Sequence, residues 1–254
     1  MNSFYRSFSI GGVGVLRSKN LKQLKLIESD SYQMLQELAI RHGASSENMN
    51  AQIGQDLFVL FTLLWKRGGY FVEFGATNGI DLSNTYLLEK DFDWGGILAE
   101  PAKVWHKDLK LNRTATLDFD CVWKETGQTL QFQVTPDAEF STLSEFKDSD
   151  AHSKERRDGT MQSVKTISLN DLLKRHNAPR LIDYLSIDTE GSEYEILKHF
   201  DFESYDVSVI TCEHNFSTNR DKVKNLLIKK GFVRVYEGFS RWDDWFVNQR
   251  CIST

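Results

Sequence analysis

The chain contains little proline and little cysteine. It has three prolines in 254 residues, and no segment is rich in Pro, Gly or Ser, so we find no linker that would divide it into separate domains. The cysteines Cys121, Cys212 and Cys251 are odd in number, far apart and without a CxxC spacing. This pattern argues against a disulfide framework or a zinc site, and we expect reduced thiols.

The sequence also lacks a long apolar run and an excess of positive charge. No stretch approaches the ~20 apolar residues that cross a bilayer. The weakly apolar segment 4–16 precedes a basic run at 17–25, which is the reverse of a signal peptide. A net charge of -5 gives no electrostatic footprint for nucleic acid or an anionic membrane. We therefore expect a cytoplasmic protein that binds neither.

The composition is that of a folded protein. Forty per cent of the residues are hydrophobic and 12% are aromatic, which argues against disorder. Apolar residues recur at helical spacing in 21–42 and in 52–67, whereas the first residues have no clear period. We expect an N-terminal helical extension over 1–50 and one main domain over 51–254.

From residue 70 onward, short apolar strands alternate with helices. The expected strands are 70–74, 96–99, 116–123, 181–187 and 207–212, with an extra one at 130–134 and a polar loop at 136–163. The helices between them are expected from residue 84, at 104–112, 168–176 with Ser168 as cap, 190–199 and 219–230. Two final strands, 232–236 and 245–247, are joined by a turn too short for a crossover helix. The pattern predicts an α/β fold with a mostly parallel, seven-stranded sheet and a C-terminal antiparallel hairpin.

Acidic residues follow the first two of these strands. Glu73 begins the segment E-F-G-A-T-N-G, in which Gly75 and Gly79 allow a tight turn and a close approach to a ligand. Glu100 ends the next strand, where a carboxylate can hold a ribose diol. Both features suit an adenosine-containing cofactor. The turn lacks the G-x-G-x-x-G of a dinucleotide site, which favours S-adenosylmethionine over NAD.

Further polar residues follow the later strands. Asp120 could accept a hydrogen bond from an adenine amino group beside Cys121, although an exposed residue after a core strand is an equal alternative. Asp188 and Glu190 follow a buried strand, and Asp188 at such a place needs a hydrogen bond or a nearby cation such as a sulfonium.

Glu213 and His214 end the following strand. A histidine near its ordinary pKa can remove a proton from a hydroxyl, while a surface histidine is the alternative explanation.

The ordered series of motifs resembles the FkbM methyltransferase family. The matching pieces, which span roughly residues 50–248, are Q-I-G-Q-D at 52–56, Y-F-V-E-F-G-A-T-N-G-I-D-L-S-N-T at 70–85, A-E-P at 99–101, S-T-L at 141–143, I-D-T-E-G at 187–191, E-H at 213–214 and D-W-F-V at 244–247. The resemblance implies a Rossmann-like class I methyltransferase fold over residues 51–254. It also implies S-adenosylmethionine as the donor and O-methylation of a hydroxyl on a sugar, another glycan or a small-molecule secondary metabolite.

The resemblance also implies a set of site residues. The donor is expected to contact Gln55, Asp56, Glu73, Gly75, Ala76, Asn78, Gly79, Ser83, Asn84, Thr85, Glu100, Pro101, Asp120, Cys121 and Asp188. The catalytic candidates are Asp188, His214, Glu213 and Glu190, with His214 as the first choice for the base and Asp188 as the second. A divalent ion held by Asp188, Glu213 and His214 is an alternative that we do not favour, so no metal ligand is assigned. An NAD-linked oxidoreductase and a non-catalytic cofactor-binding module remain the competing functions.

Overall fold

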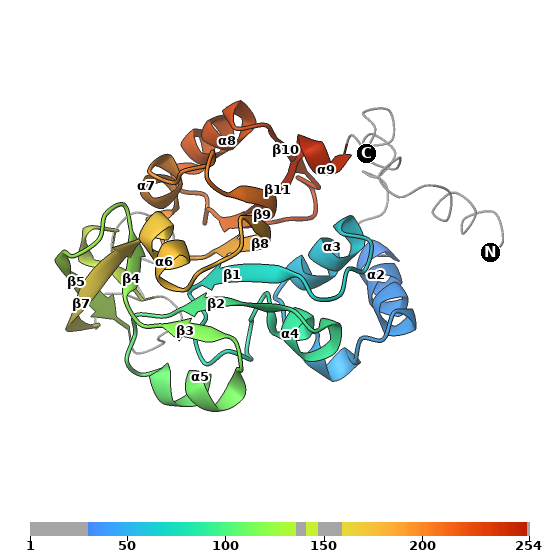
Figure 1. The fold of residues 1–254 in the computed structure, drawn as a ribbon, viewed down its shortest axis with the longest axis horizontal. Helices are drawn as coiled ribbons and strands as arrows, with labels where there is room; N and C mark the ends of the chain where they lie inside the picture. The colour runs from blue at the N-terminus through green and yellow to red at the C-terminus, as the bar shows by residue number, and fades with distance from the viewer. Residues whose placement is uncertain (1–29, 136–140, 147–158, 253–254) are drawn as a thin grey trace.

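The computed structural model describes residues 30–135, 141–146 and 159–252, which form an α/β fold around a seven-stranded sheet (Figure 1). In spatial order its strands are β10 (Phe232–Val235), β11 (Asp243–Asn248), β9 (Asp206–Glu213), β8 (Leu181–Ile187), β1 (Tyr70–Phe74), β2 (Gly95–Ala99) and β3 (Thr116–Asp118). Among these strands β11 alone is reversed, because it pairs antiparallel with both β10 and β9. The predicted Rossmann-like fold, with a mostly parallel sheet and a C-terminal hairpin, is confirmed.

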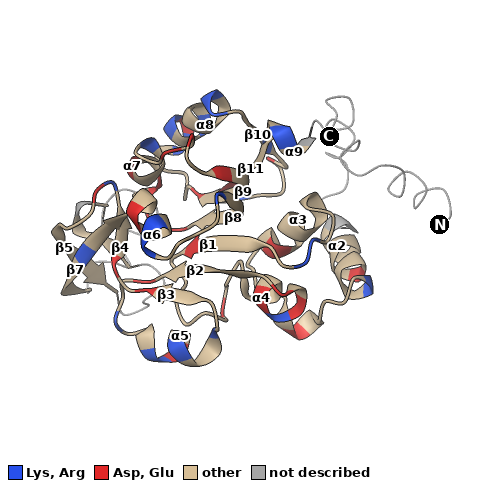
Figure 2. Cartoon of the chain, viewed as in Figure 1, with Lys and Arg blue, Asp and Glu red and all other residues tan. Residues whose placement is uncertain are grey.

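Helices cover both faces of this sheet because alternate strand residues point to opposite sides. In β1, Phe71 packs in an apolar cluster with α2, α3, α4 and α5, whereas Val72 and Phe74 pack in a second cluster with α6, α7 and α8. The helices are α2 (Asp30–Arg41), α3 (Gln55–Thr62), α4 (Tyr86–Phe92), α5 (His106–Asn112), α6 (Leu169–Arg175), α7 (Glu193–Lys198), α8 (Arg220–Lys229) and α9 (Gln249–Ile252). Figure 2 shows basic residues on the outer helices α5, α6 and α8.

A second sheet of four strands stands beside the first. Its spatial order is β4 (Cys121–Trp123), β7 (Thr160–Ser168), β5 (Thr129–Val134) and β6 (Thr142–Leu143). The extra strand expected at 130–134 is therefore confirmed as β5. The prediction of a single strand at 116–123 is wrong, because these residues form two strands, β3 in the first sheet and β4 in the second. Between them the Asp118 carboxylate accepts a hydrogen bond from the backbone N–H of Asp120 at 2.9 Å, which turns the chain.

The polar loop expected at 136–163 is also wrong in part. Thr142–Leu143 form β6, and β7 begins at Thr160. The first residues of β7 are mostly polar and largely exposed, so their composition resembles a loop, yet backbone pairing with β5 holds them in a strand. Residues 136–140 and 147–158 of the expected loop lie outside the described residues.

The helix boundaries differ from expectation at both ends. The helix expected at 52–67 spans only Gln55–Thr62, and Leu64 and Trp65 after it adopt left-handed conformations with φ of 55° and 59°. The helix expected at 190–199 begins at Glu193, because Glu190 adopts a left-handed conformation with φ of 58°. Ser168 caps α6 as expected, and its hydroxyl accepts a hydrogen bond from the N–H of Asp171 at 3.1 Å. Of the helix expected at 21–42, the structure describes α2, which packs against α3. The division at residue 50 stays a prediction. No helix in the described part of the chain is long and apolar enough to span a membrane.

Candidate active site

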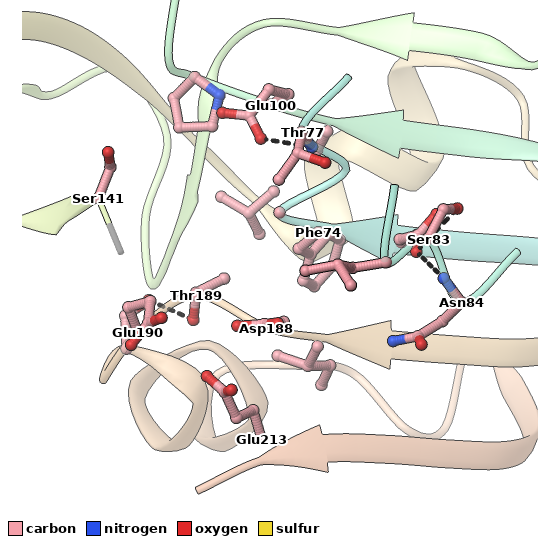
Figure 3. Close-up of a pocket in the computed structure, with 18 of the residues that line it drawn as sticks. Phe74, Thr77, Ser83, Asn84, Glu100, Ser141, Asp188, Thr189, Glu190 and Glu213 are labelled. Atoms are coloured by element: carbon pink, nitrogen blue, oxygen red, sulfur yellow. Dashed lines mark hydrogen bonds between the residues drawn. The ribbon is translucent and has the colours of Figure 1, made fainter. Parts of the chain in front are cut away.

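A cavity that opens to solvent lies at the carboxyl ends of the parallel strands (Figure 3), and its space measures about 1230 Å³ when the open solvent at its mouth is included. From β1, the chain first adds β2 and β3 on one side of the sheet and later adds β8 and β9 on the other side. In open α/β sheets, a ligand-binding crevice is expected at the point where the order of strands changes direction, which here lies between β1 and β8. Because β11 is reversed, its first residue, Asp243, lies at the same edge and opposite Glu213.

Most of the predicted site residues line this cavity. Those predicted for the donor are Gln55, Glu73, Gly75, Ser83, Asn84, Glu100, Pro101, Cys121 and Asp188, and the catalytic candidates Glu190 and Glu213 join them. The structure does not place Asp56, Ala76, Asn78, Gly79, Thr85, Asp120 or His214 in the lining.

Glu73 holds the segment that follows the turn. Its carboxylate accepts hydrogen bonds from the backbone N–H of Asn84 at 2.7 Å and from the hydroxyls of Ser83 at 3.1 Å and Thr85 at 2.5 Å. Burial raises the pKa of Glu73, and the nearby Arg113 guanidinium opposes this shift. The carboxylate thus shapes the cavity wall through contacts within the chain, and its direct contact with a donor stays a prediction.

The turn after β1 directs most of its backbone N–H groups into the protein. Gly75 donates to the carbonyl of Ala99, Gly79 to that of Ala76, and Ile80 and Asp81 to the side chain of Asn78. The N–H of Thr77 donates to Glu100 at 2.9 Å. Asn78 and Gly79 therefore have a structural role in the turn, which explains why neither lines the cavity.

Glu100 is the best-defined predicted ligand-binding group. Its buried carboxylate accepts one backbone N–H on each oxygen, from Thr77 at 2.9 Å (Figure 3) and from Ala102 at 2.8 Å. These bonds leave further lone pairs on both oxygens, since a carboxylate has about four acceptor positions. Burial raises the pKa of Glu100 to about 7, with a smaller contribution from Asp188.

Two predicted donor contacts are not supported by the geometry. The Asp120 carboxylate pairs with Arg175 at 2.8 Å and lies outside the cavity lining. Asp56 lies in the first turn of α3, where one carboxylate oxygen accepts the N–H of Leu57 at 2.7 Å and the other is buried without a partner. The contacts of Asp120 and Asp56 are therefore with other residues of the protein and not with the cavity.

Replacing Asp56 by Asn is expected to flatten the pH dependence of stability. Burial raises the Asp56 pKa to about 7 from the usual 3.8, so the folded state binds this proton more tightly and loses stability as pH rises from about 4 to 7. The amide removes that loss, and the free energy of unfolding at pH 8 should rise by roughly 1–3 kcal/mol. Urea unfolding at pH 5 and pH 8 measures the change. The exposed control Asp93→Asn should keep the wild-type slope, and a wild-type slope in Asp56→Asn would contradict the prediction.

Three carboxylates converge at the ends of β8 and β9. One oxygen from each of Asp188, Glu190 and Glu213 lies within 4.8 Å of the others, a spacing that could hold a metal ion. The side-chain amide of Asn215 donates to Glu190 at 3.1 Å. Burial raises the pKa of Glu213, and Asp188 and Glu190 raise it further. The set predicted from sequence contained His214 where the structure has Glu190.

His214 lies outside the lining of this cavity, and its role as the base stays a prediction. It directly follows Glu213, and consecutive side chains of an extended chain point to opposite sides. Its ring lies in a separate small cavity beside Arg220 and Asp244, and its Nδ1 accepts the N–H of Phe216 at 3.0 Å. Burial lowers the pKa of His214 to about 4.

The sequence reasoning missed several lining residues, among them Thr77, Phe132, Ser141, Leu143 and Asp243. Asp243 could have been found, because the first residues of a reversed strand lie at the carboxyl edge of its parallel neighbours. Ser141 and Leu143 lie in a motif that matched the family, but nothing local shows that it reaches the cavity. Phe132 lines the cavity only because the second sheet is packed there.

Residues 73–251 match the family model described as the Methyltransferase FkbM domain. The chain belongs to the FkbM methyltransferase family. Among solved structures it is similar to the methyltransferase FkbM from Methylobacillus flagellatus KT, with 12% identity and a TM-score of 0.41. That alignment covers 87% of this chain and 60% of the other, so this chain spans less than two thirds of its neighbour's length. No curated protein matches.

The family match begins at Glu73, after α2 and α3. Gln52 and Gln55 line the cavity from outside the residues that match the family. The family match does not cover this part of the cavity wall.

Proposed function

We propose that this FkbM methyltransferase uses S-adenosylmethionine to methylate a hydroxyl on a sugar or another small-molecule acceptor. The observation that carries the proposal is the position of Glu100. Its buried carboxylate lines the cavity at the end of β2 and is held in place by two backbone N–H groups. At the end of this strand of an α/β sheet, a carboxylate can accept hydrogen bonds from both hydroxyls of a ribose.

The turn after β1 argues for a donor without a pyrophosphate. A dinucleotide site needs free backbone N–H groups at this turn to hold the phosphates. Here the N–H groups of residues 75, 77, 79, 80 and 81 all donate within the protein. This arrangement, together with the family, disfavours an NAD-linked oxidoreductase.

The rest of the cavity suits the other parts of the donor. Cys121 and Val122 form an apolar wall on the Glu100 side, where the adenine would lie. Asp188 directly follows β8, where its carboxylate would stabilise a sulfonium cation. The bound donor would supply a methyl group on a positively charged sulfur, which leaves as a neutral thioether. The protein's own task is therefore mainly to position the acceptor.

A hydroxyl acceptor must also lose its proton. With His214 outside the cavity, Asp188 becomes the first candidate for the base and Glu213 the second, because both carboxylates line the cavity at the ends of β8 and β9. The proton would be accepted at a carboxylate oxygen, and positioned bases of this kind typically contribute about 10²–10⁴-fold in rate.

Calorimetry with S-adenosylhomocysteine and with NAD tests the proposal. We expect the wild type to bind the former in the micromolar range and not the latter. Glu100→Gln should weaken binding roughly 10- to 100-fold, because the amide loses the charge and cannot accept on both sides. The exposed control Glu125→Gln should bind as the wild type does. Binding of NAD instead, or unchanged affinity in Glu100→Gln, would contradict the assignment.

A further inference from the structure

The described lining of the cavity is rich in hydrogen-bond acceptors and poor in donors. Seven of its residues are Asp or Glu, and none is Lys, Arg or His. S-adenosylmethionine carries both an ammonium group and a carboxylate at its amino-acid end. The ammonium group suits such a lining, whereas the carboxylate needs hydrogen-bond donors, because an uncompensated charge away from water is costly. The chain must therefore offer a free donor to hold that carboxylate.

Three side-chain amides belong to the described lining, and two of them donate within the protein. The amide of Gln55 donates to Asp243 at 2.9 Å, and that of Asn84 donates to the hydroxyl of Ser186 at 3.0 Å. Hydroxyl groups of the lining also donate within the protein, at Thr77, Ser83, Thr189 and Ser192. The third amide is that of Gln52, and among the described residues its nitrogen makes no hydrogen bond.

Trp242 fixes the direction in which the Gln52 amide points. Its indole N–H donates to the carbonyl oxygen of Gln52 at 3.1 Å. An indole can donate but not accept, so the carbonyl oxygen must face Trp242 and the amide nitrogen must point away from it. Gln52 is exposed at the cavity wall, so a ligand can reach both of its free N–H groups.

The chain around Gln52 is anchored to two parts of the cavity wall. Its neighbour Ala51 forms an isolated parallel bridge with Leu82, which lines the cavity in the segment after β1. Trp242 immediately precedes β11, which lies on one side of β1, whereas β2 and its Glu100 lie on the other. In the proposed binding mode the donor runs from Glu100 to Asp188 after β8, so its amino-acid end lies on the β11 side, where Gln52 is held.

We propose that the side-chain amide of Gln52, oriented by Trp242, binds the carboxylate of S-adenosylmethionine and makes the site selective for a donor with an intact amino-acid end. The inference rests on the proposed function and names the group that recognises one end of the donor. A hydrogen bond from an amide N–H to a carboxylate is charge-assisted and stronger than one between neutral groups. Trp242 is a positioning residue, because it acts on the donor only through Gln52.

Calorimetry with two probes tests the assignment. S-adenosylhomocysteine carries the carboxylate, whereas 5′-methylthioadenosine has the same adenosine and sulfur but no amino-acid end. Gln52→Ala should weaken binding of S-adenosylhomocysteine about 10- to 100-fold, the usual effect of losing a hydrogen bond to a charged group. Binding of 5′-methylthioadenosine should change less than about twofold, because that probe has nothing to pair with Gln52.

Two further variants at the same position separate charge from damage to the fold. Gln52→Glu keeps an oxygen that can face Trp242 but replaces the N–H groups by a negative oxygen, so it should bind S-adenosylhomocysteine more weakly than Gln52→Ala does. Gln52→Lys should bind within about threefold of the wild type, because an ammonium group can also hold the carboxylate. This order of affinities serves if 5′-methylthioadenosine binds too weakly to measure.

The positioning role has its own variant and control. Trp242→Phe keeps an aromatic ring but removes the indole N–H, and it should weaken binding of S-adenosylhomocysteine about three- to tenfold while sparing 5′-methylthioadenosine. Gln131→Ala is the control, because Gln131 is an exposed amide on β5 that donates to Ser163 at 3.1 Å and lies outside the cavity lining. It should bind both probes as the wild type does.

Three results would overturn the inference and leave the proposed function standing. Equal losses for both probes in Gln52→Ala would give Gln52 a purely structural role. Unchanged affinity for S-adenosylhomocysteine would leave its amide to the methyl acceptor, and affinities that do not follow the charge at residue 52 would exclude a contact with the carboxylate. If the wild type binds no S-adenosylhomocysteine at all, the proposed function fails and this inference fails with it.

Discussion

Gly75→Ala is expected to weaken binding of S-adenosylhomocysteine by at least about 100-fold. Gly75 has φ of 75°, and a Cβ there would lie 2.2 Å from the backbone carbonyl oxygen of Asp188. Neither backbone can yield easily, because β1 and β8 are paired up to Phe74 and Ile187, the residues just before the contact. The methyl group must therefore push apart the two strand ends that line the cavity, and 100-fold corresponds to only about 2.7 kcal/mol.

The matched control for this change is Gly127→Ala. Gly127 has a similar φ of 89°, but a Cβ there would meet nothing within 4 Å. It therefore carries the cost of an unfavourable backbone conformation without the clash. Calorimetry on both variants, after circular dichroism has shown that they fold, separates the two effects. An affinity within threefold of wild type in Gly75→Ala would show that the strand ends can separate at little cost.

Arg113→Met is expected to lower the free energy of unfolding by roughly 3–5 kcal/mol, the usual effect of removing one partner from a buried ion pair. The Arg113 side chain is fully buried and donates to Glu89 at 2.8 Å, to the carbonyl of Gly79 at 3.1 Å and to the hydroxyl of Thr85 at 2.9 Å. It also lies 3.7 Å from Glu73. Without it, Glu73 would be a buried carboxylate with no counter-ion.

Urea unfolding measures this loss, with Arg180→Met as the control. Arg180 pairs with Asp206 at 3.1 Å, but its side chain is 69% exposed, so its removal should cost at most about 1 kcal/mol. Adding Glu73→Gln to Arg113→Met should recover part of the loss, because the uncompensated charge is then removed as well. Equal losses for Arg113→Met and Arg180→Met would show that burial does not strengthen this network.

The order of the elements could be predicted because hydrophobic periodicity is local. The strands at 70–74, 181–187 and 207–212 are apolar runs whose ends carry Glu73, Asp188 and Glu213, and a parallel sheet brings such ends to one edge. The short turn before β11 likewise predicted an antiparallel hairpin. The second sheet could not be predicted as a whole, because β6 is two residues long and β7 begins with polar residues.

Side-chain direction at the site depended on contacts that are distant in sequence. Asp120 follows a strand end as Glu100 does, yet it pairs with Arg175, 55 residues further on. Glu213 and His214 are neighbours in sequence, but Glu213 lines the large cavity whereas His214 lines only the smaller one beside it. Sequence position identified the polar residues at strand ends, but not which of them face the ligand.

The family, the order of strands and helices, and the edge of the sheet at which Glu100 and Asp188 lie could all be predicted, because they follow from local patterns and the rules of parallel sheets. Packing between distant segments, by contrast, brings Glu190 together with Asp188 and Glu213 and leaves His214 out. It also places Asp243, from the far end of the chain, opposite Glu213. The reason is that pairing between β9 and β11, and the turn at Glu190, depend on packing between segments that no local pattern relates.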